Sequence, residues 1–360
     1  MARPIVATID LTAIAANVAR VRRYAPGAEV IAVVKANAYG HGLLRVLPAL
    51  SDADGVALIE LDGALALRAA GYRRPILLLE GFFEARELDS IGREAIGVVV
   101  HDIEQVRQLE SARLERPIDV YVKANTGMNR LGFAPEQVAP VCSRLAGAGS
   151  VASVRLLTHF ARADEDDGIA EVKRRFEQAT AHLPYRRSLA NSAGVVRYAA
   201  VGGDSVRPGI MLYGATPFAS RSAQSLGLAP AMTLTSKLIA VQTLAPGDSV
   251  GYGGTFHAPR PMRVGVVACG YADGYPRHAP NGTPVLISGH RVPMAGRVSM
   301  DMLTVDLSDV PEATVGTDVV LWGDGLPVDD VAAAASTVGY ELLCAVAPRV
   351  RFVVRERSGA

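Results

Sequence analysis

Short strand-like runs alternate with helical patterns eight times between residue 30 and about residue 210, and this recurrence constrains the fold most strongly. The runs are apolar, as in strands buried on both faces, and cover residues 30–34, 55–59, 75–79, 96–100, 118–122, 153–158, 187–190 and 204–207. Helical spacing recurs at 62–70, 84–92, 103–112, 135–146, 168–182 and 192–198. An open doubly wound sheet has a similar pattern, but eight such units favour a closed TIM-type (β/α)8 barrel. We therefore predict an α/β fold built on this barrel.

The pattern changes after Pro230, where short strand-like runs alternate with Gly/Pro turns at spacings typical of all-β folds. These runs cover residues 233–243, 262–268, 284–287, 302–305 and 318–321, and 328–338 is the only helical pattern among them. We predict two domains, a barrel over 1–230 and a mostly β C-terminal domain over 231–360. Residues 1–10 include a strand-like run at 5–9, which is a candidate to pair with the second domain.

Composition excludes several classes of function. The 37 basic residues against 36 acidic ones give a net charge of +1, so no nucleic acid or other polyanion is an expected partner. Three cysteines (Cys142, Cys269 and Cys344) lie far apart, which argues against a disulfide framework and against a metal site. No apolar run approaches the ~20 residues of a membrane span, and the N-terminal residues do not have the cationic start and clean apolar segment expected of a secretory signal. We expect a cytoplasmic protein without a membrane association.

Lys35 ends the first predicted barrel strand, at the face where such barrels place their chemistry. A lysine ammonium between apolar walls is destabilised, and the free amine can form an imine. An ordinary solvated lysine is the alternative interpretation. The neighbouring cluster of Asn37, Tyr39, His41 and two glycines favours a functional role, since such residues weaken a fold unless they are needed.

Polar segments follow other predicted strands and would meet at the same barrel face: 123–130, 158–160, 191–192 and 207–210. The last two loops of such barrels commonly hold phosphate with backbone N–H groups and hydroxyls. An imine-forming lysine beside a phosphate site suggests pyridoxal 5′-phosphate (PLP). A Schiff-base aldolase acting on a sugar phosphate fits these features nearly as well, and the pattern alone leaves both open.

The chain carries, in order, the motifs AVVKANAYGHG, NTGMNRLGF, THFARADE, ANSAG, VRPGIMLYG, GYGGTF, GYADGYPR and GRVSMDM. This combination, spread over essentially the whole chain, strongly resembles the alanine racemases. The resemblance implies a PLP-binding barrel with a C-terminal β domain, interconversion of L-alanine and D-alanine, and a homodimer whose active sites take residues from both subunits. Broader amino-acid racemisation and a non-catalytic PLP-binding barrel are the alternatives, although the latter proteins lack the β domain. A fold-related decarboxylase would need an acidic partner for the pyridine nitrogen, where Arg207 stands.

The resemblance also implies a role for individual residues. Lys35 would carry PLP as an imine and act as one base, and Tyr252 would be the opposing base, reaching in from the other subunit. A free tyrosine titrates near pH ~10, and His159 beside Arg207 is the family's arrangement to favour the phenolate. Arg207 would donate to the pyridine nitrogen, which then stays unprotonated because a guanidinium keeps its proton.

The remaining implied roles concern cofactor phosphate and substrate. The residues matching cofactor contacts are Tyr39, Asn191, Ser192, Gly209 and Ile210. Arg130 and the backbone N–H of Met300 would bind the substrate carboxylate, and Lys123 would be carbamylated to position Arg130. Supporting positions are Asp301 beside Met300, Tyr271 at the entrance, and Arg277 and Arg297 in the outer channel. Two departures are expected: Pro348 where many relatives carry a phosphate-contacting tyrosine, and Ser299 where some carry cysteine. A biosynthetic or a catabolic role is left open.

Overall fold

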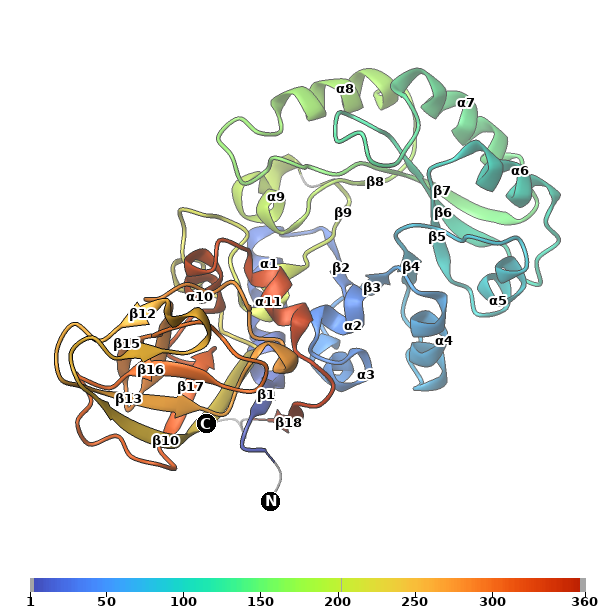
Figure 1. The fold of residues 1–360 in the computed structure, drawn as a ribbon. Coiled ribbons are helices and arrows are strands. Elements are labelled where there is room, and N and C mark those ends of the chain that lie inside the picture. Colours follow the sequence, from blue (N-terminus) through green and yellow to red (C-terminus); the bar gives the residue numbers. More distant parts are fainter. Residues whose placement is uncertain (1–2, 202, 357–360) are drawn as a thin grey trace.

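A closed barrel of parallel strands forms the first part of the chain (Figure 1). The computed structural model describes residues 3–201 and 203–356. Within these ranges the barrel strands are β2 (Glu29–Val33), β3 (Gly55–Leu58), β4 (Ile76–Leu78), β5 (Gly97–Val100), β6 (Ile118–Lys123), β7 (Val151–Leu157), β8 (Arg187–Ser188) and β9 (Ser205–Val206). The last strand pairs with the first, Glu29 with Ser205 and Val30 with Val206. This closure excludes an open sheet and confirms the predicted barrel.

Helices follow most of the barrel strands, and local sequence explains where three of them begin. The helices are α1 (Leu11–Tyr24), α2 (Lys35–Tyr39), α3 (Leu43–Val46), α4 (Leu61–Ala69), α5 (Glu87–Arg93), α6 (Ile103–Ser111), α7 (Pro135–Ala146), α8 (Ala170–Thr180) and α9 (Ser192–Arg197), with short 3₁₀ turns η1 (Leu47–Leu50), η2 (Ala199–Val201), η3 (Ile210–Tyr213) and η4 (Gln224–Leu226). The side chains of Asp10, Asp102 and Asn191 each accept a backbone N–H from the first turn of a helix, at 3.0, 2.8 and 3.0 Å. Such caps satisfy donors that would otherwise have no partner.

The second part of the chain is mostly β. Its strands are β10 (Met232–Leu244), β11 (Ser249–Val250), β12 (Phe256–His257), β13 (Met262–Val267), β14 (Pro284–Ile287), β15 (His290–Pro293), β16 (Leu303–Asp306), β17 (Asp318–Trp322) and β18 (Arg351–Arg355), with 3₁₀ turns η5 (Tyr252–Gly254) and η6 (Tyr271–Asp273). The main sheet has the order β15-β14-β17-β10-β1-β18, and β13 pairs with β10 and β16. The long strand β10 has a register shift between Leu238 and Ala240, which lets it pair with several neighbours.

Two helices lie in this second part, α10 (Val328–Ala334) and α11 (Gly339–Ala345). The prediction of a single helix over 328–338 was therefore wrong at its C-terminal end. Ser336 adopts a positive φ of 56° and interrupts the helical path. The short second helix then buries Leu342 and Leu343, which is too few turns for a clear period in the sequence.

The first strand of the chain, β1 (Val6–Asp10), is not part of the barrel and lies in the C-terminal sheet (Figure 1). It pairs antiparallel with β10, Val6 opposite Thr235, and parallel with β18, Val6 opposite Arg351. The chain therefore ties its two parts together through its N-terminal segment.

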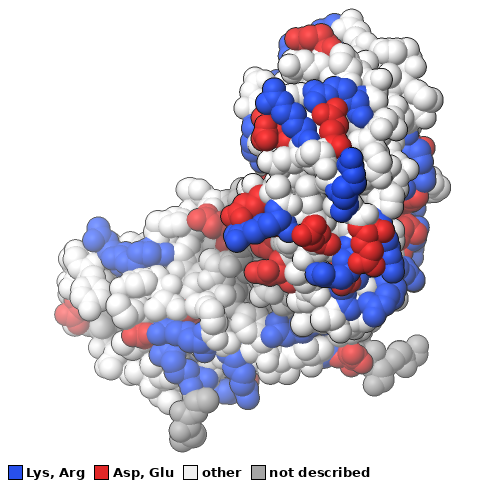
Figure 2. Space-filling model, turned by 90° about the vertical axis from the view of Figure 1, so that its right-hand side faces the viewer, with Lys and Arg blue, Asp and Glu red and all other residues white. Residues whose placement is uncertain are grey.

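Charged side chains of both signs are interspersed over the face shown in Figure 2. Many charged side chains of the protein form ion pairs, such as Arg144 with Glu110 at 2.7 Å. This face therefore has no extended field of one sign. In the part of the chain that the structure describes, we find no helix that is both long and apolar enough to traverse a bilayer.

Candidate active site

A cavity of about 870 Å³ opens at the carboxyl ends of the barrel strands. Ten of the residues singled out in the sequence line it together: Lys35, Tyr39, Lys123, Arg130, His159, Asn191, Ser192, Arg207, Gly209 and Ile210. They come from the ends of β2, β6, β7, β8 and β9 and the segments that follow, which are distant in sequence. Barrel closure brings these ends to one mouth, where such folds place their sites.

Lys35 is followed by a left-handed helical turn. Ala36, Asn37 and Ala38 have φ/ψ near 52/49°, 54/46° and 57/51°, and Tyr39 has a φ of 50°. Each residue in this conformation costs about 1–2 kcal/mol, so contacts elsewhere must hold the turn. Asn37 contributes one of them, because its side-chain oxygen accepts the Leu43 N–H at 2.8 Å. The turn folds Tyr39 back into the cavity, although an alanine-rich segment would favour a right-handed helix.

Tyr39, Ser192 and Gly209 converge in one corner of the cavity. The Gly209 N–H donates to Ser192 Oγ at 2.9 Å, and Ser192 begins helix α9. A Cβ on Gly209 would lie 2.5 Å from the Tyr39 hydroxyl, so only glycine lets this hydroxyl approach the backbone so closely. Two hydroxyls beside backbone N–H groups form a cradle suited to a phosphate.

Arg207 is almost completely buried in the cavity wall, at 5% exposure. Its guanidinium donates to Ser188 Oγ and to the Thr158 carbonyl, both at 2.6 Å, and to the Leu189 carbonyl at 3.3 Å. Burial lowers the pKa of Arg207 to about 10, so it stays a cation near neutral pH. No carboxylate among the described residues forms an ion pair with it, which is unusual for a buried arginine.

His159 lies beside this cation. Burial, together with the positive charges of Arg207 and Lys123, lowers the pKa of His159 to about 3, so the imidazole stays neutral. Asn191 Nδ2 is 3.4 Å from His159 Nε2 and donates to the Phe160 carbonyl at 3.0 Å. Asn191 therefore both caps α9 and orients the imidazole.

Lys123 is buried at the end of β6, and Arg130 lines the same cavity from the loop that follows. Burial is the main reason that the pKa of Lys123 falls to about 8, and the nearby charges of Arg130 and Arg207 lower it further. A substantial share of this lysine is therefore a neutral amine at mildly alkaline pH.

The candidate residues of the C-terminal domain do not line this cavity. Tyr252 and Met300 are 69% and 53% exposed on the single chain. Tyr271 and Met300 lie on two adjoining loops, because the N–H of Tyr271 donates to the Ser299 carbonyl and that of Ala272 to the Met300 carbonyl, both at 3.0 Å. Asp301 on the same loop accepts from Arg349 at 2.6 Å.

Helix α11 supplies cavity residues that sequence reasoning missed. Tyr340 and Cys344 line the cavity, and the Tyr340 ring lies 5.9 Å from the Tyr39 ring. Pro348, in contrast, lies outside the cavity lining. Helix α11 nevertheless places a tyrosine, Tyr340, in the cavity lining. The sequence feature that could have revealed Tyr340 is a polar aromatic residue within the apolar pattern of residues 338–345.

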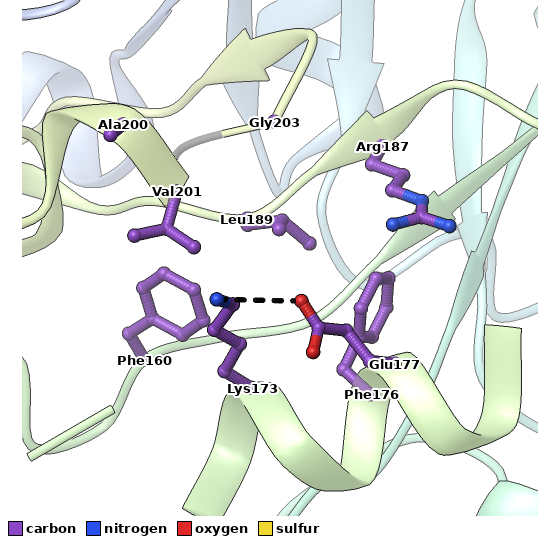
Figure 3. Close-up of a pocket in the computed structure, with 9 residues that line it drawn as sticks. All are labelled: Phe160, Lys173, Phe176, Glu177, Arg187, Leu189, Ala200, Val201 and Gly203. Atoms are coloured by element: carbon purple, nitrogen blue, oxygen red, sulfur yellow. Dashed lines mark ion pairs between the residues drawn. The ribbon is translucent and has the colours of Figure 1, made fainter. Parts of the chain in front are cut away.

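A second cavity, of about 250 Å³, lies outside the barrel between α8 and the segments around β8 (Figure 3). Phe160, Phe176 and Leu189 line it, and Lys173 and Glu177 are paired with each other at 3.5 Å. None of the candidate residues lies here. No group of three or more His, Cys, Asp or Glu side chains in the described ranges could hold a metal ion.

Comparison with known proteins gives consistent matches over the whole chain. The family models "Alanine racemase, N-terminal domain" and "Alanine racemase, C-terminal domain" match residues 9–217 and 231–354. The chain is 54% identical to an alanine racemase of Nitrosospira multiformis, over 98% of this chain and all of the relative. It is 52% identical to a catabolic alanine racemase of Klebsiella aerogenes, over 98% and 99% of the two chains.

Solved structures agree with the sequence matches. The biosynthetic alanine racemase of Pseudomonas aeruginosa superposes with a TM-score of 0.95 at 50% identity, over 98% of this chain and 99% of that one. The alanine racemase of Acinetobacter baumannii has a TM-score of 0.94 at 38% identity, over 98% and 100%.

Proposed function

The chain belongs to the alanine racemase family and interconverts L-alanine and D-alanine, and we propose that it does so with PLP held at the barrel mouth. We also propose that Lys35 and Tyr252 are the two bases and that the working form is a homodimer with shared active sites. The observation that best supports this cofactor is Arg207, which is buried in the wall of the cavity that also holds Lys35 and has no carboxylate partner among the described residues.

The residues present fit PLP. Lys35 would supply the amine that carries the cofactor, and the hydroxyls of Tyr39 and Ser192 and the N–H groups of Gly209 and Ile210 would bind its phosphate. The glycine at position 209 supports this assignment, since a Cβ there would collide with the Tyr39 hydroxyl. When bound, PLP withdraws electrons from the substrate α-carbon and so makes its proton removable.

Arg207 would donate to the pyridine nitrogen of bound PLP. Its pKa of about 10 keeps the guanidinium protonated near neutral pH, so it donates a hydrogen bond without transferring a proton. The ring nitrogen would then remain unprotonated, and the ring would withdraw electrons less strongly. Arg207 thereby favours return of the proton to the α-carbon over side reactions such as transamination.

Racemisation needs a base on each face of the α-carbon. One base removes the α-proton from one face, and the conjugate acid of the other returns a proton to the opposite face. Lys35 serves one face and Tyr252 the other, and the two exchange roles when the reaction runs in reverse. His159, held neutral beside Arg207, would donate a ring N–H to the Tyr252 oxygen and so favour its phenolate form.

Tyr252 reaches the cavity of a second subunit. Tyr252, Met300 and Tyr271 are all exposed on the single chain, as expected for side chains that a second subunit would cover. The Met300 N–H and Arg130 bind the substrate carboxylate, Asp301 anchors the Met300 loop, and Tyr271 lines the entrance. A carbamate on Lys123, formed from its neutral amine, holds Arg130 in place.

Mixing two inactive variants tests both bases and the shared site. Lys35→Ala and Tyr252→Phe should each abolish racemisation as homodimers. Unfolding and refolding them together yields hybrids in which one site takes both lesions and the other takes none. If half of the dimers are hybrid, about a quarter of wild-type activity returns. No recovery in the mixture, with hybrids verified by two affinity tags, would show that the bases act within one subunit or not at all.

A further inference from the structure

Three segments, two of them consecutive in sequence and one distant, must keep fixed relative positions for the cofactor site to work. They are the end of β2 with Lys35, the left-handed turn with Tyr39, and the loop with Gly209 and Ile210 that leads into η3. Hydrogen bonds within the β-barrel do not fix the last two, because both lie beyond the strand ends.

Tyr213, at the end of η3, links this loop to the lysine strand. Its side chain is 2% exposed, and its hydroxyl donates to the Val33 carbonyl at 2.9 Å. The Val33 N–H in turn donates to the Pro208 carbonyl at 2.9 Å. Two hydrogen bonds with the backbone of Val33 therefore hold both ends of the segment that carries Gly209 and Ile210.

The Tyr213 ring also supports the left-handed turn. It stacks on the Tyr39 ring with centroids 4.8 Å apart and an interplanar angle of 28°. On the same turn, the His41 ring lies 4.6 Å from the Tyr213 ring. His41 is fully buried, and its Nδ1 lies 3.1 and 3.0 Å from the carbonyls of Ala38 and Tyr39. One aromatic side chain thus contacts all three segments.

We propose that Tyr213 is a positioning residue for the cofactor phosphate. Its hydroxyl sets the distance between the phosphate cradle and the lysine strand, and its ring holds the Tyr39 hydroxyl over Gly209. Tyr213 touches neither the substrate nor the reacting atoms. This inference rests on the proposed binding of PLP and concerns its phosphate end.

The test compares cofactor binding by Tyr213→Phe and by wild-type protein, each stripped of cofactor. The variant keeps the stacked ring but leaves the buried Val33 carbonyl without its donor. The dissociation constant for PLP, measured by absorbance titration, should rise about tenfold. Pyridoxal, which lacks the phosphate, should bind both proteins equally. The KM for alanine at saturating PLP should stay unchanged, and added PLP should restore the rate.

Tyr198→Phe is the matched control, since its hydroxyl also donates to a carbonyl, that of Glu165 at 3.0 Å, but on an exposed surface. It should leave PLP binding unchanged. A double variant with Tyr39→Phe should weaken PLP binding by less than the product of the single effects, because Tyr213 acts partly through Tyr39.

Unchanged PLP affinity in Tyr213→Phe would overturn the inference, as would equal weakening of PLP and pyridoxal or multiplicative effects in the double variant. Thermal midpoints of the stripped proteins separate loss of fold from loss of binding. If wild-type protein itself fails to bind PLP, the proposed cofactor is wrong, and that result is distinct from a failure of the Tyr213 inference.

Discussion

Replacing Ala36 by glycine should stabilise the protein, although the same change in an ordinary helix destabilises it. Ala36 lies in the left-handed turn with φ 52° and ψ 49°, and its side chain is exposed. An L-residue pays about 1–2 kcal/mol for this conformation, which glycine adopts freely. Glycine also gives the unfolded chain more freedom, which costs about 0.4–1 kcal/mol. The net gain should be about 0.5–1 kcal/mol.

Ala16→Gly provides the matched control, because Ala16 is also exposed but lies inside the right-handed helix α1. That variant should lose about 1 kcal/mol. The two variants are compared by urea unfolding of the cofactor-free proteins, all at the same protein concentration. Removing the cofactor avoids the stabilisation that bound ligand adds. The midpoints should move in opposite directions. A similar loss in both variants would refute the view that the turn after Lys35 stores conformational strain.

Three further changes test the site and its supports. Gly209→Ala places a Cβ 2.5 Å from the Tyr39 hydroxyl, so PLP affinity should fall about tenfold or more; an unchanged titration would contradict the cradle. Carbamylation of Lys123 can be monitored by NMR with labelled bicarbonate. The carbamylated fraction should increase as pH rises through about 8, because only the neutral amine adds carbon dioxide. A carbamylated fraction that does not depend on pH would contradict this expectation. Asp273→Ala removes a fully buried carboxylate that pairs with two arginines, and should cost about 3 kcal/mol in urea unfolding; a loss under about 1 kcal/mol would mean that these pairs act as surface pairs.

The barrel and most of its mouth could be predicted from sequence because topology leaves little choice. Parallel strands that close on themselves bring all their carboxyl ends together. The polar residues at Lys35, His159 and Arg207 could therefore be placed at one site before their distances were known. The buried strands supported this, since their apolar runs are continuous.

The left-handed turn after Lys35 could not be predicted, because Ala36 and Ala38 are good formers of right-handed helix. Contacts with η3 and with α11 override that preference; a Cβ on Gly40 would lie 2.1 Å from the Leu343 carbonyl. Tyr340 was missed for a related reason. Its helix is short, and only tertiary packing reveals that it covers the barrel mouth.

The positions of Tyr252 and Met300 pose a different problem. A single chain leaves both exposed and away from the Lys35 cavity. Their proposed role depends on a second subunit, and no property of one folded chain specifies that contact. Their assignment rests on the motifs that carry them.

Solvent exchange during turnover tests the central claim most directly. The enzyme with PLP is incubated with L-alanine in heavy water, and the products are separated by chiral chromatography with mass detection. Two-base racemisation predicts D-alanine that carries one α-deuterium, because Lys35 and Tyr252 exchange their protons with solvent. Two results would contradict proton removal on one face and return from a second base on the other. One is that no D-alanine forms, and the other is D-alanine that retains the original α-proton throughout.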